Sequence, residues 1–136
     1  MFEIFEHTAD LGIRVVAADV DTLFADAGKG LFAVIVANLA DVRPVQEVAF
    51  RLAGSQPDYL LFDWLNELLY TFESRRLLLA EFQVRVSPTG LEATARGEPA
   101  DETRHTLEHE VKAITYHALK VEQTPTGWLA EVIVDI

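Results

Sequence analysis

The hydrophobic positions of the chain change from strand-like to helix-like spacing and back. Residues 3–19 carry many β-branched side chains around a short polar stretch, which predicts a strand, a turn and a strand. Apolar residues then recur at helical spacing, and we expect a helix with Asp21 as N-cap that runs to about Asn38. Gly28 and Gly30 either weaken this helix or allow close packing against a neighbour.

The next helix has the clearest pattern in the sequence. A strand is expected over residues 45–52, and residues 55–58 (SQPD) then have the spacing of a capping box with an early proline. The following apolar residues form one continuous helical face: Leu60, Leu61, Trp64, Leu65, Leu68, Leu69 and Phe72. The opposite face carries Asp63, Asn66, Glu67 and Tyr70.

Two hairpins are expected after this helix, each joined by a Pro-Thr-Gly turn. The first pairs residues 78–86 with 91–96, and the second pairs residues 112–122 with 128–135. The polar stretch over residues 97–105 predicts a loop.

The stretch between the two hairpins fits both a helical stripe and a strand, because its apolar residues satisfy either period. We interpret residues 105–110 as a helical turn or loop that leads into the next strand.

These elements predict the fold class. About seven mainly antiparallel strands and two long helices packed on the sheet indicate an α+β protein, because strands and helices do not alternate as a parallel βαβ sheet requires. At 136 residues the chain has the length of one domain, and we expect residues 1–136 to form it.

The composition bears on the compartment in which the protein is expected to act. Half of the residues are hydrophobic and there are no cysteines, which excludes disulfides, thiolate metal sites and cysteine nucleophiles and fits a reducing compartment. No stretch approaches the ~20 apolar residues of a membrane helix. The N-terminal sequence MFEIFE lacks the basic start of a signal peptide, so a cytoplasmic location is expected.

The charge is strongly acidic. Eleven Lys and Arg residues against 22 Asp and Glu residues give a net charge of −11. Direct binding of RNA or DNA is not expected, because nucleic-acid affinity depends on cationic side chains. An acidic surface suits a basic protein partner or hard cations, and solubility alone is the other explanation.

Three polar clusters could carry chemistry, and each has a structural explanation as well. Residues 6–10 (EHTAD) lie between two strands and suit a turn with an Asx-type hydrogen bond. His105 and His109 are four residues apart, so on a helix they could share a transition metal, or the segment could simply be solvated. His117, inside an expected strand, suits a hydrogen-bonded structural role.

The third cluster is the end of the sequence. If the natural chain ends at Ile136, its α-carboxylate lies next to the Asp135 carboxylate. Two neighbouring anionic groups repel each other unless a cation lies between them, and oxygen donors without sulfur favour Ca²⁺, Mg²⁺ or Mn²⁺. Chain ends commonly fray, but the apolar residues up to Val134 indicate that this one is docked.

Four stretches, in this order, resemble the archease family. They are residues 5–13 (FEHTADLGI), 63–70 (DWLNELLY), 109–117 (HEVKAITYH) and 133–136 (IVDI). The first and third are the most distinctive. Generic catalytic motifs are absent, including a phosphate-binding glycine loop and the Gly-x-Ser-x-Gly and His-Glu-x-x-His patterns.

The resemblance implies a function that composition alone does not. Archeases are partners of the tRNA-splicing type RNA ligase, which joins a 2′,3′-cyclic phosphate or 3′-phosphate end to a 5′-hydroxyl. They promote GTP-dependent guanylylation of the ligase and its multiple turnover, without being enzymes themselves. The resemblance also implies a divalent cation site, usually described with Ca²⁺, whose ligands correspond to Asp10, Asp135 and Ile136. It further implies a functional role for Lys112, with His7 and Glu110 as additional candidates for contact with the partner or a phosphate.

Two other functions remain open at this point. One is a metal-dependent phosphoester hydrolase that uses His105, His109 and nearby carboxylates, although no complete ligand set with orienting partners is evident. The other is a general chaperone-like interaction module that uses an exposed apolar or acidic patch.

Overall fold

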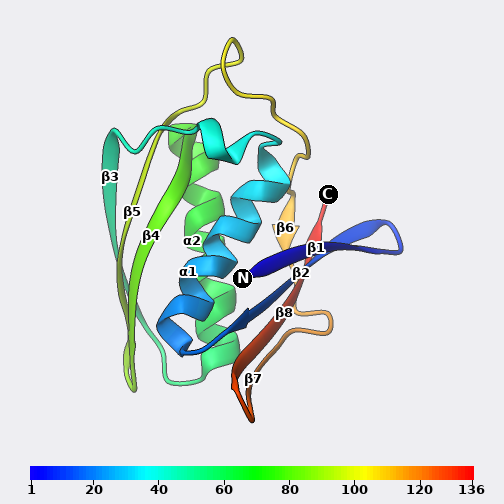
Figure 1. Cartoon of the computed structure of the whole chain (residues 1–136), viewed down its shortest axis with the longest axis vertical. Coiled ribbons are helices and arrows are strands. Elements are labelled where there is room, and N and C mark those ends of the chain that lie inside the picture. The colour runs from blue at the N-terminus through cyan, green and yellow to red at the C-terminus, as the bar shows by residue number, and fades with distance from the viewer.

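The fold consists of two antiparallel sheets with two helices between them, seen in a computed structural model that describes residues 1–136 (Figure 1). The larger sheet has the order β1-β2-β8-β6, with β7 also paired to β8. The smaller sheet has the order β3-β5-β4. The elements are β1 (Phe2–His7), β2 (Asp10–Ala17), α1 (Val20–Ile35), a short 3-10 turn η1 (Leu39–Asp41), β3 (Gln46–Ala53), α2 (Pro57–Arg75), β4 (Leu77–Ser87), β5 (Gly90–Pro99), β6 (Ala113–Ile114), β7 (Lys120–Thr124) and β8 (Gly127–Asp135).

The α+β class with antiparallel pairing is confirmed, but the arrangement differs from the expected one in two ways. There are eight strands rather than about seven, and they form two sheets rather than one. The strand expected over residues 112–122 is divided into β6 and β7 by a turn. The Thr115 hydroxyl donates to the Ile133 carbonyl at 2.9 Å, and Ala118 has a φ of +54°, so the chain leaves β8 here before it returns as β7.

Helix α1 is in contact with both sheets, which explains its glycines. A Cβ at Gly28 would lie 2.9 Å from the Phe82 ring of β4, and one at Gly30 would lie 2.7 Å from Ile13 Cγ2 of β2. Both distances are too short for a real side chain, so the glycines allow the helix to approach a sheet on each side. The close packing considered from the sequence is therefore found at both positions.

The predicted N-cap and end of α1 were both wrong. Asp19, not Asp21, is the N-cap, because its Oδ1 accepts the Thr22 N–H at 2.7 Å. Asp21 lies in the first turn, where its carboxylate accepts the Val86 N–H of β4 at 2.8 Å. The helix ends at Ile35, not near Asn38.

The apolar face expected for α2 is buried in the core. Trp64 is completely buried between the two sheets, and its indole N–H donates to the Phe24 carbonyl of α1 at 3.0 Å. The expected capping box does not form, because Gln56 is the N-cap and makes no side-chain cap bond, while Pro57 occupies the first turn. The first hairpin is confirmed, but β5 extends to Pro99, into the segment expected to be a loop.

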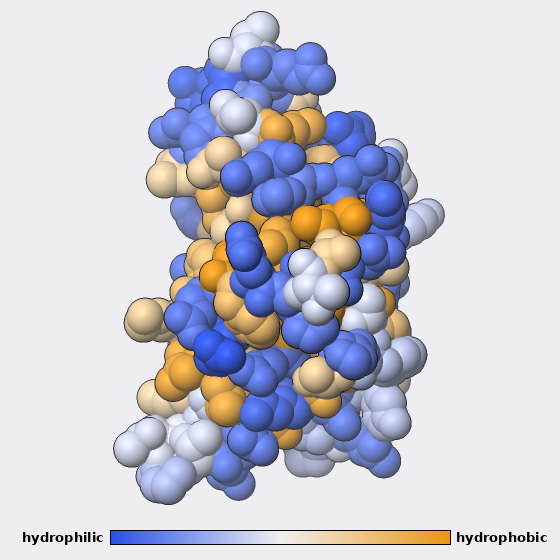
Figure 2. Space-filling model, turned by 90° about the vertical axis from the view of Figure 1, so that its right-hand side faces the viewer, coloured by the Kyte–Doolittle hydropathy of each residue, from blue (hydrophilic) through white to orange (hydrophobic).

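The face of the molecule on the side of the larger sheet is polar, with apolar patches of limited size among hydrophilic side chains (Figure 2). No helix is long and apolar enough to cross a membrane.

Candidate functional site

The hairpin of β1 and β2 places Asp10 at the start of an inner strand. The two strands pair antiparallel, and the last pair before the turn is His7 with Asp10. Thr8, in the turn, has a φ of +50°, the left-handed region that residues other than glycine seldom adopt. The Asp10 carboxylate makes no hydrogen bond or ion pair, so the Asx-type turn considered from the sequence is not present.

The pairing of β2 with β8 brings the β1–β2 turn close to the end of β8. The last pair in this register is Leu11 with Val134. One further step along the register places Asp10 opposite Asp135, and residues that lie opposite in an antiparallel pair project from the same face, with Cβ atoms about 4.5–5.5 Å apart. Asp10, Asp135 and Ile136 are all half-buried. We call this region, defined by Asp10, Asp135 and Ile136, the acidic corner.

The acidic corner offers oxygen donors only. Two are side-chain carboxylates and the third comes from the main chain of Ile136. No group of three or more His, Asp or Glu side chains that could hold a metal is found anywhere in the structure, and the acidic corner itself contributes only two carboxylate side chains. Neither Asp10 nor Asp135 has a cationic partner, so their mutual repulsion is not offset by the protein itself. The residues present fit a weak site for a hard cation.

The segment with Lys112 runs alongside the acidic corner. The Lys112 N–H donates to the Asp135 carbonyl at 2.7 Å, and Ala113 then pairs with Asp135 in β6. Val111 is buried, whereas Glu110 and Lys112 on either side of it are exposed. The Lys112 ammonium forms no ion pair and is free to meet an external anion.

His7 adds a contact that the sequence did not reveal. Its ring lies 5.2 Å from the ring of His117, and its Nδ1 is buried without a hydrogen-bond partner. His117 belongs to the exposed turn between β6 and β7, so the expectation of a histidine within a strand is wrong. His7 and His117 are 110 positions apart in the sequence, so no local pattern could predict their contact, which depends on the fold.

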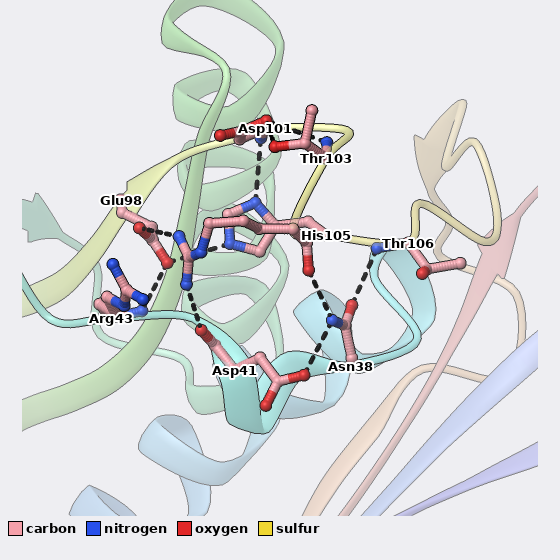
Figure 3. A network of polar contacts seen from close by, with 9 residues as sticks. Asn38, Asp41, Arg43, Glu98, Asp101, Thr103, His105 and Thr106 are labelled. Atoms are coloured by element: carbon pink, nitrogen blue, oxygen red, sulfur yellow. Dashed lines mark hydrogen bonds and ion pairs between the residues drawn. The ribbon is translucent and has the colours of Figure 1, made fainter.

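His105 has a structural role, which corrects the shared metal site considered from the sequence, while residues 105–110 form a loop, one of the two alternatives expected. Residues 105–110 form no helical turn, so His105 and His109 do not share a helical face. His105 is buried rather than solvated, and its Nδ1 accepts the Asp101 N–H at 2.9 Å (Figure 3). The proton therefore lies on Nε2, which donates to Glu98 at 3.0 Å. The histidine pair required by the hydrolase hypothesis is absent.

Glu98 is the centre of this polar network. Its carboxylate accepts hydrogen bonds from the Arg104 side chain at 2.6 Å and from the Arg43 N–H at 2.7 Å, in addition to His105. The Arg104 guanidinium is the largest of the causes that hold the pKa of Glu98 at about 2, against a usual value of 4.5. Asn38 extends the network, because it donates to the Arg104 carbonyl and accepts the Thr106 N–H. The network therefore fixes the loop before residues 105–112.

The fold and the acidic corner together define a small acidic α+β protein in which the β1–β2 turn lies close to the end of the last strand. Residues 2–136 match the sequence profile of the Archease protein family (MTH1598/TM1083). The chain is 39% identical to the protein archease of Methanopyrus kandleri, covering 99% of both chains, and 36% identical to that of Pyrococcus furiosus, covering 99% of this chain and 98% of the relative. The chain belongs to the archease family.

Solved structures agree with this assignment. The solution structure of Methanobacterium thermoautotrophicum protein 1598 superposes with a TM-score of 0.88 at 30% identity, covering 99% of this chain and 98% of that one. The crystal structure of an archease from Thermotoga maritima, described as a possible chaperone, has a TM-score of 0.69 at 21% identity and covers 100% of this chain and 98% of that one. The second likeness concerns the fold alone.

Proposed function

We propose that this protein is a non-enzymatic activator of the GTP-dependent RNA ligase of tRNA splicing, and that it acts in the cytoplasm with a divalent cation at the acidic corner. Membership of the archease family supports a helper role. The observation that supports the proposal is the β2–β8 register, whose last pair, Leu11 with Val134, lies one step before Asp10 and Asp135. Neither the Asp10 nor the Asp135 carboxylate forms an ion pair within the chain.

The chemistry of the corner favours a hard cation. Two carboxylates without a cationic partner gain stabilisation from a divalent ion, and ligands made only of oxygen select Ca²⁺, Mg²⁺ or Mn²⁺. Ca²⁺ is the proposed occupant. When bound, the ion supplies positive charge to phosphate oxygens. The contribution of the chain is to hold the donors at the end of a rigid sheet, with Asp10 and Asp135 on one face.

Phosphoryl and nucleotidyl transfer depend mostly on positioning and electrostatics. An acidic corner inserted beside the nucleotide of the ligase would orient the triphosphate for attack by the ligase's own nucleophile. Lys112, exposed and without an ion pair, supplies a cation for a phosphate at the edge of the same site. Glu110 and His7 lie within this surface and are proposed as further contacts.

The net charge of −11 favours association with a cationic surface of the ligase. A ligase that binds RNA presents a cationic surface. This surface attracts an acidic protein as well as the RNA substrate. The attraction weakens when salt shortens the Debye length to about 8 Å at physiological ionic strength. Stimulation of the ligase is therefore expected to fall as salt rises, and the protein itself is not expected to bind RNA.

The test compares charge-neutral variants of the corner with a matched control. Asp10→Asn and Asp135→Asn should fold normally but lose stimulation of GTP-dependent ligase guanylylation, and should fail to support multiple turnover when added in substoichiometric amount. Glu81→Gln removes one exposed negative charge from β4 in the other sheet, and it should stimulate normally. Calorimetry with Ca²⁺ should show heat of binding for wild type and control but not for the corner variants.

Two results would contradict the proposal. Full stimulation by both corner variants would remove the role of the acidic corner. Suppression of aggregation of unrelated client proteins, without effect on the ligase and without dependence on a cation, would instead identify a general chaperone.

A further inference from the structure

A cluster of three aromatic rings, two of them exposed and one partly buried, lies on the surface between α2 and the turn that follows β6. The rings of Phe62 and Tyr116 stack with centroids 3.9 Å apart and planes inclined by 14°, and Tyr59 meets Tyr116 edge-on at 6.0 Å. Tyr59 is 52% exposed and Tyr116 is 59% exposed. Phe62 packs against the core, whereas Tyr116, stacked on it, keeps most of its surface in solvent; because aromatic rings contribute most when they are buried, this exposed ring indicates a contact surface. We call Tyr59, Phe62 and Tyr116 the aromatic cluster.

The backbone holds Tyr116 in place from both sides. The Thr115 N–H and hydroxyl both donate to the Ile133 carbonyl of β8, at 3.0 and 2.9 Å. The Leu119 N–H donates to the Tyr116 carbonyl at 3.2 Å, and Ala118 has a left-handed backbone. Because the turn is fixed by these bonds, the ring is presented to a partner at a low cost in conformational entropy.

Unpaired carboxylates surround the aromatic cluster. Asp63 lies four residues after Tyr59, on the same side of α2, and Asp58 precedes Tyr59 directly. Glu67 continues the same exposed stripe one turn later. None of these three carboxylates forms an ion pair within the chain, so the rings lie in a negative field. Such a field repels the phosphates of RNA and favours a cation above the rings.

The aromatic cluster is continuous with the acidic corner. Tyr116 directly precedes His117, whose ring lies 5.2 Å from that of His7, and His7 pairs with Asp10. On the other side, β6 ends two residues before Tyr116 and pairs with Asp135. A partner that accepts the acidic corner therefore has the aromatic cluster within reach.

We propose that the aromatic cluster is the docking surface for an arginine-bearing basic segment of the protein partner. An arginine guanidinium is planar, so it can stack on an exposed tyrosine ring and pair with a neighbouring carboxylate at the same time. Tyr59 and Tyr116 offer the ring faces, and Asp63 offers the carboxylate. This inference rests on the proposed function in one respect, because the partner taken for the test is the RNA ligase.

The test measures affinity and activity separately. Tyr116→Ala and Tyr59→Ala should each raise the Kd for the ligase roughly tenfold, as expected when an aromatic anchor is removed from an interface. Stimulation of guanylylation at saturating concentration should be unchanged, because the acidic corner is intact. Tyr116→Phe keeps the stack and should bind as wild type. Circular dichroism and thermal melts establish that each variant is folded.

Tyr70→Ala is the matched control. Tyr70 is 65% exposed and lies on the same helix, about 16 Å along its axis from Tyr59, outside the aromatic cluster. Its removal should leave the Kd unchanged. A second pair tests charge: Asp63→Asn should weaken binding and flatten its salt dependence, whereas Glu73→Gln, ten residues further along α2, should do neither.

The possible failures are distinguishable. Wild-type affinity in both Tyr59→Ala and Tyr116→Ala would overturn the docking surface, while loss of stimulation in Asp10→Asn would still support the proposed function. If the tyrosine variants weaken ligase binding but wild type does not stimulate guanylylation, the docking surface stands and the proposed function fails. Binding of a single-stranded RNA oligonucleotide by wild type and not by Tyr116→Ala would overturn the assignment to a basic protein.

Discussion

Replacement of Glu98 by glutamine tests the physical reasoning about the buried polar network. The side chain of Glu98 is 9% exposed, and its carboxylate accepts bonds from Arg104, His105 and the Arg43 N–H. Glu98→Gln keeps the shape but removes the charge. The charge-assisted bonds to Arg104 become weaker, and the Arg104 guanidinium keeps its own partial burial without a counter-ion.

The pKa of Glu98 gives the size of the effect. A pKa of about 2 in the folded protein against a usual value of 4.5 corresponds to about 3 kcal/mol, at ~1.36 kcal/mol for each unit of difference. Because the folded-state pKa is the lower one, this stabilisation is fully present above pH 4.5 and is lost as pH falls toward 2. At pH 3 only about 1 kcal/mol of it remains, since the carboxylate is then still ionised in the folded chain and mostly protonated in the unfolded chain.

Urea unfolding of wild type and Glu98→Gln at pH 7 and pH 3 measures both quantities. We expect the variant to be less stable by about 3 kcal/mol at pH 7, and the difference to shrink by about 2 kcal/mol at pH 3. Glu92→Gln is the control, because its pair with Arg51 is exposed and should contribute less than about 1 kcal/mol. A difference for Glu98→Gln that is the same at both pH values, or below about 1 kcal/mol at pH 7, would refute the reasoning.

Three further substitutions test the fold, with the free energy of unfolding in urea as the measurement in each case. Asp19→Ala removes the N-cap bond of α1 and should destabilise the protein by about 1 kcal/mol. Gly97→Ala places a Cβ against the Leu78 carbonyl oxygen, which belongs to the backbone and cannot rotate away, so a loss of at least about 2 kcal/mol is expected. Trp64→Phe leaves the buried Phe24 carbonyl without its donor and should cost about 2 kcal/mol, and a loss within ±0.5 kcal/mol of zero would contradict the role given to this bond.

The sequence pattern correctly predicted the elements that depend on residues only a few positions apart. The apolar face of residues 60–72 and the turns at residues 87–90 and 124–127 were found as expected, because helical spacing and turn residues act within a few positions. The N-cap of α1 was missed by two residues. Asp19 and Asp21 are equally good caps by type, and only the distant Val86 N–H, 65 residues away, determines what Asp21 does.

The division into two sheets was not accessible from the sequence. An alternating strand pattern shows which face is buried but not which strand lies beside it, so pairing over long distances had no signal. The same limit applied to His105. Its partner Glu98 lies seven residues earlier, at the end of a strand that the sequence pattern placed in a loop. A polar stretch was therefore taken to be solvated, although its charges satisfy one another inside the protein.

The residue pattern indicated Asp135 and Ile136 as possible cation ligands, but only the family resemblance joined Asp10 to them. Asp10 and Asp135 are separated by almost the entire chain, and their meeting depends on β2 pairing with β8 in one register. A slip of one residue would turn one of the two carboxylates to the opposite face. Buried Ile13 and Val132, which pair with each other in this register, hold it in place, because a slip would expose them.

The buried network and the acidic corner are connected through residues 105–112. This segment has little regular structure of its own, so its position depends on contacts at each end. At one end His105 is bound to Glu98, and at the other the Lys112 N–H is bound to Asp135. Between them the Glu108 N–H donates to the Ile35 carbonyl at the end of α1. The network around Glu98 thus fixes the position of the segment that carries Lys112 to the acidic corner. The buried His105 therefore contributes to the site by holding this segment, without contacting a ligand itself.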